Sequence, residues 1–107
     1  MSNKDIVLVI DDDRVDREIL KNILSKDFYV VDYQDAQEGF DFLARHEQDV
    51  KCVVVDVYMP GMDGFELCEI LKNDVKTKDI PIIFISGGMS KEDKIKGFKL
   101  GAVDFIN

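Results

Sequence analysis

The 107-residue sequence contains a single histidine and only two cysteines. Cys52 and Cys68 match no CxxC or zinc-ligand spacing, so we expect both to be reduced and to pack in or near the core without a redox role. His46 follows the second predicted helix, away from the ends of the predicted strands, which excludes a Ser-His-Asp triad and a histidine metal site. The motifs GxGxxG and GxxxxGK are also absent, and with them the common nucleotide-binding loops.

The chain has no apolar run that approaches the roughly 20 residues of a membrane-spanning helix. Its first residues do not form a signal-peptide pattern, and we therefore expect a cytoplasmic protein without membrane contact. Basic residues number 14 against 22 acidic ones, which gives a net charge of −8. Because binding to a nucleic-acid backbone requires a basic face, this balance argues against direct contact with nucleic acid.

The hydrophobic pattern predicts one α/β domain over residues 1–107. Short apolar runs alternate with segments of helical periodicity. The predicted strands are residues 5–10, 28–33, 50–55, 82–85 and 103–106, and the predicted helices begin after Asp13, after Asp35, at Asp63 or Gly64, and after Ser90. This alternation implies a doubly wound parallel sheet with helices on both faces. Of the two common strand orders we predict 2-1-3-4-5, in which the first and third strands are neighbours.

Carboxylates follow two of these strands. Asp11, Asp12 and Asp13 come directly after the first strand, and Asp56 ends the third. In the order 2-1-3-4-5 these side chains meet at one edge of the sheet, where ligands of open parallel sheets bind. Converging carboxylates repel one another, and Mg²⁺, which prefers oxygen ligands, relieves that repulsion. The alternative is that the three consecutive aspartates form a solvated cap on the first helix.

Asp56 is a candidate nucleophile toward phosphorus, because carboxylates form aspartyl-phosphate intermediates. The plainer interpretation is that Asp56 caps the turn that follows the strand. Ser86 ends the fourth strand, where its hydroxyl would reach a phosphoryl oxygen, and Gly87 and Gly88 would expose backbone N–H groups to an anion. Ser86 has its own alternative as a turn residue before the two glycines.

The sequence resembles the receiver domain of bacterial two-component response regulators over its whole length. Four segments in order carry the resemblance: Val9–Asp13, Val54–Gly64, Pro81–Gly87 and Gly101–Ile106. The resemblance implies that Asp56 accepts a phosphoryl group from the phosphohistidine of a sensor histidine kinase or a phosphotransfer protein. The chain would then be a phosphoacceptor in signalling rather than an enzyme.

The same resemblance implies the other roles at the site. Asp11, Asp12 and Asp56 would hold Mg²⁺ together with the backbone carbonyl of Tyr58. Ser86 would be the hydroxyl that turns toward the phosphoryl group. Phe105 would be the aromatic residue whose rotation reports that movement on the face formed by the fourth helix and fifth strand. The side chain of Tyr58 would shield the phosphoryl group from water.

The sequence departs from the family pattern at its C-terminal end. Family members carry a Lys-Pro pair and a fifth helix after the fifth strand, whereas this sequence ends at Asn107. We therefore expect a receiver domain truncated before that helix, with apolar surface from the first, third and fifth strands exposed. Such a surface would favour a homodimer or a domain swap.

Two other functions fit parts of the sequence. Asp11 to Val15 match the DxDxV loop of haloacid dehalogenase-like phosphatases, with Ser86 as the strand-end hydroxyl and Lys91 or Lys94 as the lysine. That interpretation leaves the Asp56 loop unexplained. The other alternative is a receiver-like binding module that no longer uses phosphorylation, which the missing lysine favours and the complete set of aspartates opposes.

Overall fold

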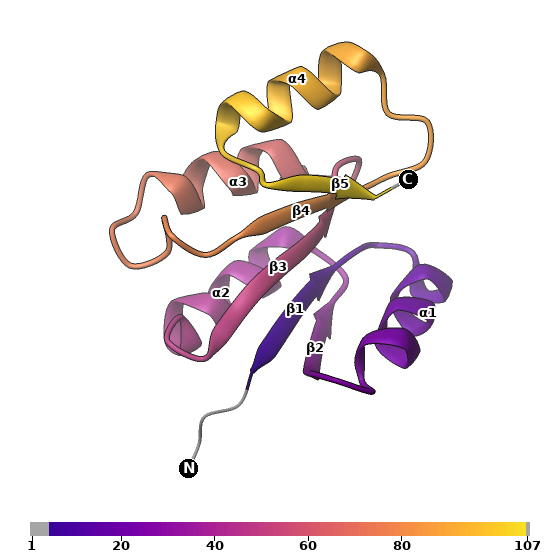
Figure 1. Ribbon diagram of the computed structural model, residues 1–107, viewed down its shortest axis with the longest axis vertical. Helices are drawn as coiled ribbons and strands as arrows, with labels where there is room; N and C mark the ends of the chain where they lie inside the picture. Colours follow the sequence, from indigo (N-terminus) through magenta and orange to yellow (C-terminus); the bar gives the residue numbers. More distant parts are fainter. Residues whose placement is uncertain (1–4, 107) are drawn as a thin grey trace.

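Strands and helices alternate along the chain, as the hydrophobic pattern predicts. The computed structural model describes residues 5–106, and Figure 1 shows the arrangement of the elements. The strands are β1 (Ile6–Ile10), β2 (Tyr29–Tyr33), β3 (Val50–Asp56), β4 (Ile82–Ile85) and β5 (Asp104–Ile106). The helices are α1 (Arg14–Leu24), α2 (Ala36–His46), α3 (Gly64–Lys72) and α4 (Lys91–Leu100). Each predicted boundary lies within a residue or two of the observed one.

All five strands are parallel and lie in the order β2-β1-β3-β4-β5, which confirms the predicted sheet. The register determines what gathers at the carboxyl edge. Ile10 of β1 pairs with Val55 of β3, so Asp11 and Asp56 leave neighbouring strands at the same level. Asp56 in turn pairs with Ile85 of β4, which places Ser86 one step beyond it.

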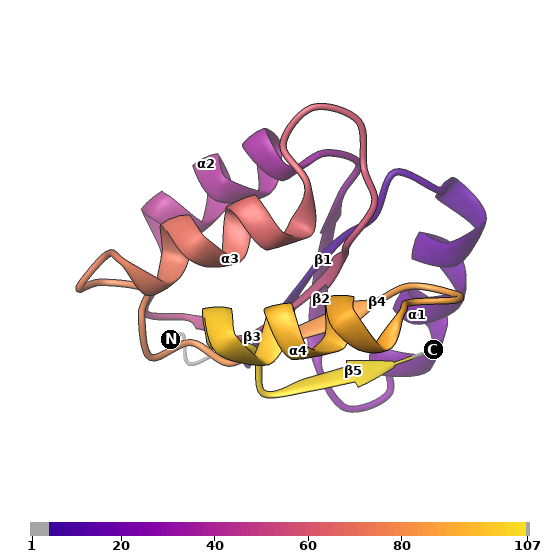
Figure 2. The same ribbon diagram turned by 90° about the horizontal axis from the view of Figure 1, so that it is seen from above.

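Alternate side chains of the strands enter two separate cores. Leu8, Val53, Val55 and Phe84 belong to the larger core, which also contains side chains of α2 and α3. Val7, Val9 and Val54 face the other way and pack against Leu20 and Leu24 of α1. Figure 2 shows α1 on the opposite side of the sheet from α2 and α3. The predicted cover of helices on both faces is therefore confirmed, with α1 alone on one face.

Helix α1 presents an apolar stripe to solvent. Val15, Ile19 and Ile23, whose four-residue spacing predicts the helix, are 65%, 51% and 59% exposed. The packing contacts come instead from Leu20 and Leu24. The periodicity identifies the helix correctly, but the most regular apolar stripe is not the one that packs on the sheet.

Helix α4 packs through its smallest residue. Ile95 and Phe98, expected among its apolar residues, are 47% and 52% exposed. Gly97 is buried instead, and a Cβ built on it would lie 2.6 Å from Cζ of Phe105 and 2.8 Å from Cε2 of Phe84. Because glycine allows this close approach, two aromatic rings contact the helix backbone directly.

The predicted helix starts are confirmed by their capping hydrogen bonds. The side chains of Asp13, Asp35, Asp63 and Ser90 each accept a hydrogen bond from a backbone N–H in the first turn of the following helix. At α3 the contact is a reciprocal capping box between Asp63 and Glu66. Within residues 5–106, no helix has the length and hydropathy needed to cross a bilayer.

Gly64 allows α3 to start against the end of β3. A Cβ built on Gly64 would lie 2.5 Å from the backbone oxygen of Asp56 and 3.0 Å from Cα of Val57. We expect Gly64→Ala to lower the free energy of unfolding by roughly 1–3 kcal/mol, the usual cost of overpacking a close contact. Urea unfolding measures this change. Gly87→Ala is the matched control, because a Cβ there meets nothing within 4 Å; equal losses from both substitutions would contradict the prediction.

Candidate functional site

Three carboxylates meet at the carboxyl edge of the sheet. One oxygen from each of Asp11, Asp12 and Asp56 lies within 4.8 Å of the other two. Asp11 and Asp12 follow β1, and Asp56 is the last residue of β3, so the adjacency of these two strands produces the cluster. The structure thus brings together the three acidic residues that the sequence places at the ends of two strands.

Backbone contacts hold Asp11 in place. Its side chain is only 2% exposed and accepts a hydrogen bond from the backbone N–H of Asp13 at 2.9 Å. Its own N–H donates to the carbonyl of Tyr33 at 3.2 Å. Arg17 donates from Nη1 to the Asp11 carbonyl at 2.8 Å, and its Nε lies 3.2 Å from Oδ2 of Asp32. The loop after β1 is therefore bonded to both β2 and α1.

Burial and mutual repulsion raise the pKa values of Asp56 and Asp11. Burial is the largest cause that raises the pKa of Asp56 to about 7, followed by the negative charge of Asp11. A hydrogen bond from the backbone N–H of Tyr58 to Oδ1 of Asp56, at 3.3 Å, acts in the opposite direction. Burial also raises the pKa of Asp11, and the N–H of Asp13 opposes that shift. A cation between these carboxylates would favour their ionised forms.

The donor set fits a hard divalent cation. The cluster consists of carboxylates and contains neither His nor Cys, and Mg²⁺ takes oxygen ligands and is usually bound through one or two carboxylates. Two oxygens bound to one ion at about 2.0–2.1 Å lie at most about 4.2 Å apart, and the 4.8 Å within which the three carboxylate oxygens lie is close to that span. The site is therefore chemically suited to Mg²⁺ through Asp11, Asp12 and Asp56.

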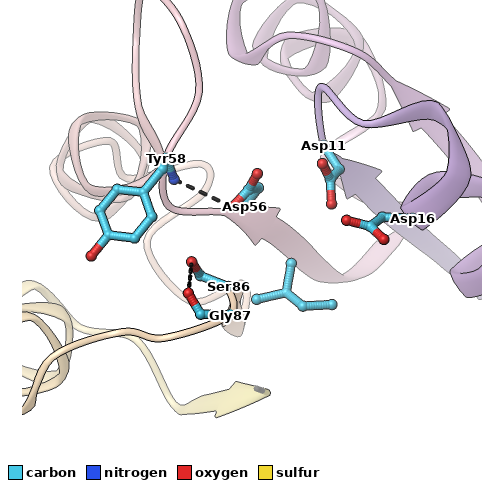
Figure 3. Close-up of a pocket in the computed structure, with 7 residues that line it drawn as sticks. Asp11, Asp16, Asp56, Tyr58, Ser86 and Gly87 are labelled. Carbon is cyan, nitrogen blue, oxygen red and sulfur yellow. Dashed lines mark hydrogen bonds between the residues drawn. The ribbon is translucent and has the colours of Figure 1, made fainter.

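Asp16 is a fourth carboxylate that sequence reasoning did not place at the site. It lines the same pocket as Asp11 and Asp56, and Figure 3 shows its carboxylate beside that of Asp11. Its charge also raises the pKa of Asp11. The sequence signal was an acidic residue in the first turn of a helix, which is equally typical of a helix N-terminus with no other role.

The pocket in front of Asp56 has a volume of about 510 Å³. Its lining residues are Asp11, Asp16, Asp56, Tyr58, Ile85, Ser86 and Gly87. The hydroxyl of Ser86 donates to the carbonyl of Gly87 at 3.4 Å, as Figure 3 shows, and forms no hydrogen bond with Asp56. The pocket therefore contains an acidic side formed by β1 and α1 and a hydroxyl side formed by the end of β4.

Phe105 lies behind this pocket, on β5 next to β4. Its ring is half-buried and contacts Phe84 and Phe98, with centroid distances of 5.5 and 4.7 Å. Phe105 pairs with Phe84 across the sheet, one residue before Ile85 of the pocket. The aromatic ring thus connects the strand that ends in Ser86 with α4.

The fold and the pocket define a doubly wound α/β domain with an acidic, oxygen-rich site at the carboxyl edge of its sheet. The family model of the response regulator receiver domain matches residues 7–107. The chain therefore belongs to the response regulator receiver domains, the phosphoacceptor signalling domains of two-component systems. Receiver domains bind Mg²⁺ in an acidic pocket and interact with histidine kinases or phosphotransfer proteins.

Individual relatives support this assignment. The chain is 37% identical over 101 residues to the response regulator PleD of Caulobacter vibrioides, covering 94% of this chain and 22% of PleD. It is 33% identical over 102 residues to the transcriptional regulatory protein YvrH of Bacillus subtilis, covering 94% of this chain and 41% of YvrH. The chain thus spans less than half of these curated relatives. In fold, it is similar to the chemotaxis protein CheY4 of Vibrio cholerae, with a TM-score of 0.88, 24% identity, and coverage of 96% of this chain and 85% of CheY4.

The raised pKa of Asp56 predicts how stability depends on pH. Between the ordinary value of 3.8 and about 7, the folded protein keeps a proton that the unfolded chain has released. The free energy of unfolding should therefore fall as pH rises through this interval, because the native state binds more protons there. Asp56→Asn, which is neutral at every pH, should remove that part of the fall in metal-free buffer.

Urea unfolding in the presence of a chelator, at several pH values from 4 to 8, measures the effect. Asp41→Asn is the control and should keep the pH dependence of the parent, because Asp41 is an exposed residue of α2 that neither lines the pocket nor contributes to the raised pKa values of Asp11 and Asp56. Identical pH dependences for the parent and Asp56→Asn would contradict the prediction.

Proposed function

We propose that Asp56 is the phosphoacceptor of this receiver domain. A carboxylate oxygen of Asp56 would attack the phosphorus of a phosphohistidine; the new O–P bond forms as the P–N bond breaks, and the imidazole nitrogen leaves with the electron pair. The observation that carries the proposal is the convergence of Asp11, Asp12 and Asp56 within 4.8 Å beside Ser86. Of these carboxylates, Asp56 lies centrally, between the acidic side of the pocket and Ser86 (Figure 3).

Asp11, Asp12 and Asp56 would hold Mg²⁺, with the backbone carbonyl of Tyr58 as a further ligand. When bound, the cation neutralises charge on the cluster and on the phosphoryl oxygens. The protein's own part is to position the acceptor. The Tyr58 N–H donates to Oδ1 of Asp56 at 3.3 Å, and the side chain of Asp12 forms a further hydrogen bond with this carboxyl group, so two neighbours hold the acceptor at the pocket.

Ser86 and Phe105 would transmit the phosphorylation of Asp56 to the surface formed by α4 and β5. Ser86 now bonds the adjacent Gly87 carbonyl at 3.4 Å, a long hydrogen bond that a phosphoryl oxygen can replace with a stronger one. Rotation of Ser86 toward Asp56 would leave space at the end of β4, beside the ring of Phe105. The result would be a changed surface on α4 and β5, where Phe98 and Ile106 are already 52% and 44% exposed.

The apolar stripe of α1 supports a helical phosphodonor partner. Val15, Ile19 and Ile23 lie on the same helix as Asp16, which lines the pocket. An amphipathic helix packed along this stripe would place a histidine of that helix near Asp56. We therefore place the kinase or phosphotransfer protein on α1. We also propose that this contact takes place in the cytoplasm, and that neither nucleic acid nor membrane is a direct partner of this domain.

The haloacid dehalogenase alternative is not favoured by the loop after β1. In the DxDxV match, Asp13 would have to face the reacting group. Its carboxylate instead accepts hydrogen bonds from the N–H groups of Val15 and Asp16, at 2.8 and 3.2 Å, and so caps α1. No described feature of the pocket requires Lys91 or Lys94, neither of which lines it.

Phosphorylation by acetyl phosphate in the presence of Mg²⁺ tests the proposal. We expect one phosphoryl group per chain in the parent and in Asp13→Asn, and none in Asp56→Asn. Asp12→Asn and addition of a chelator should both lower the labelling rate at least about tenfold, the lower end of the loss typical when the residues that support a metal site are removed. Intact-mass spectrometry measures the stoichiometry. Equal labelling of Asp56→Asn, or sustained turnover of p-nitrophenyl phosphate, would contradict the assignment.

We also propose that the uncovered part of the α1 face of the sheet is an interface with a second copy of this domain. A hollow of about 380 Å³ lies there, lined by Val7, Leu20, Leu24, Phe28, Lys51, Cys52, Val54, Ile83 and Ile106. The expected exposure is more local than the sequence suggested. Val7 and Val54 are only 4% and 5% exposed because α1 covers them, whereas Ile106 is 44% exposed. The uncovered part is thus the β4–β5 side, which presents an apolar surface to a partner.

The oligomeric state of the 107-residue chain tests this second proposal. Exposed apolar surface favours association, so we expect light scattering to show dimers whose fraction rises with concentration. Ile106→Asp should reduce that fraction, and Val75→Asp, at a residue 78% exposed and outside the hollow, should not. A monomer at every concentration would contradict the proposal.

A further inference from the structure

A hydrogen bond connects the rim of the phosphoacceptor pocket to the first turn of α4. The hydroxyl of Tyr58 donates to Oδ2 of Asp93. Tyr58 follows β3 and lines the pocket with Asp56 and Ser86, whereas Asp93 lies 35 residues further along the chain. The contact therefore connects the loop after β3 to the first turn of α4 without passing through the sheet.

The bond fixes the direction of the Tyr58 side chain. The Tyr58 ring is largely exposed, at 52%, and only its hydroxyl has a specific partner among the described side chains. Figure 3 shows the ring beside Asp56 with its hydroxyl directed away from the carboxylates of Asp56 and Asp11. A long exposed side chain has several rotamers available. In the rotamer that contacts Asp93, the Tyr58 ring does not cover the carboxylate of Asp56.

Asp93 is itself held in place. Its backbone N–H donates to Oγ of the N-cap Ser90 at 3.0 Å, which fixes it in the first turn of α4. The neighbouring Glu92 occupies the same turn with the same charge but is exposed and has no described contact with Tyr58. The chain therefore contains an acidic residue that makes the contact and an equivalent one that does not.

We propose that Asp93 is a positioning residue that holds Tyr58 clear of Asp56 and thereby shortens the lifetime of the phosphoryl group. The inference rests on the proposed phosphoacceptor role of Asp56. With Asp93 in place, water reaches the acyl phosphate through the open mouth and hydrolyses it, releasing inorganic phosphate and the Asp56 carboxylate. Without Asp93, the Tyr58 hydroxyl can turn to a phosphoryl oxygen, where it donates a hydrogen bond and its ring covers the group.

The phosphoryl half-life measures this effect. After labelling with acetyl phosphate and removal of excess reagent, Asp93→Ala should lengthen the half-life by roughly three- to tenfold, the factor that corresponds to one net hydrogen bond. Asp93→Asn keeps an acceptor and should restore most of the parent rate. Glu92→Ala removes the same charge from the same turn and should leave the half-life unchanged.

A double substitution separates positioning from a general effect on α4. Tyr58→Phe removes the hydroxyl, so in that background Asp93→Ala should have no further effect on the half-life. If Asp93→Ala lengthens the half-life as much in Tyr58→Phe as in the parent, Asp93 does not act through Tyr58. If it leaves the half-life of the parent unchanged, the proposed role is wrong.

The contact can also be tested without phosphorylation. The hydrogen bond between the Tyr58 hydroxyl and Asp93 is the largest of the causes that raise the pKa of Tyr58 above its ordinary value of 10.0. In an ultraviolet titration, with Tyr58→Phe used to assign the signal, Asp93→Ala should return that pKa toward its ordinary value and Glu92→Ala should not. An unchanged titration would overturn the contact itself. A changed titration in a parent chain that acetyl phosphate cannot label would overturn the function of Asp56 instead.

Discussion

The parallel pairing of β1 with β3 is the constraint on which the site depends. Because Ile10 lies opposite Val55, Asp11 and Asp56 lie at the same edge of the sheet, where their carboxylates are close together. Like charges in a partly buried place are unfavourable, and the neighbouring backbone compensates only in part, through the N–H groups of Asp13 and Tyr58. The fold therefore creates a need for positive charge, and a bound cation would stabilise the native state because the unfolded chain lacks the arrangement.

Much of this arrangement could be predicted because it follows from local signals. The apolar runs that form β1 and β3 end abruptly in aspartate, and each helix begins at an Asp or Ser that caps it. Each strand end and each helix cap is therefore recognisable from a few consecutive residues. The placement of the carboxylates then required only that the two strands be neighbours, which the doubly wound order supplies.

Other features of the site could not be predicted, because they depend on how separate elements approach one another. Asp16 looks like an ordinary first-turn acid until α1 is placed against β1. The contact of Tyr58 with Asp93 depends on the paths of two loops and has no sequence pattern. On α1 and α4, the apolar periodicity marks the helix but not the packed face, since Leu20 and Gly97 contact the sheet while Ile19 and Phe98 are exposed.

Helix α4 is where the two connections from the pocket converge. Its first turn holds Tyr58 through Asp93, and its last turns hold Phe105 through Gly97 and Phe98. Both contacts lie on this one 10-residue helix, so in the proposed function a tilt of α4 that follows a new position of the Phe105 ring would also move Asp93. Movement of Asp93 alters the hold on Tyr58 and hence the access of water to Asp56. In the proposed function, the signalling surface and the phosphoryl lifetime would therefore be coupled through one helix, without any contact between Phe105 and Tyr58.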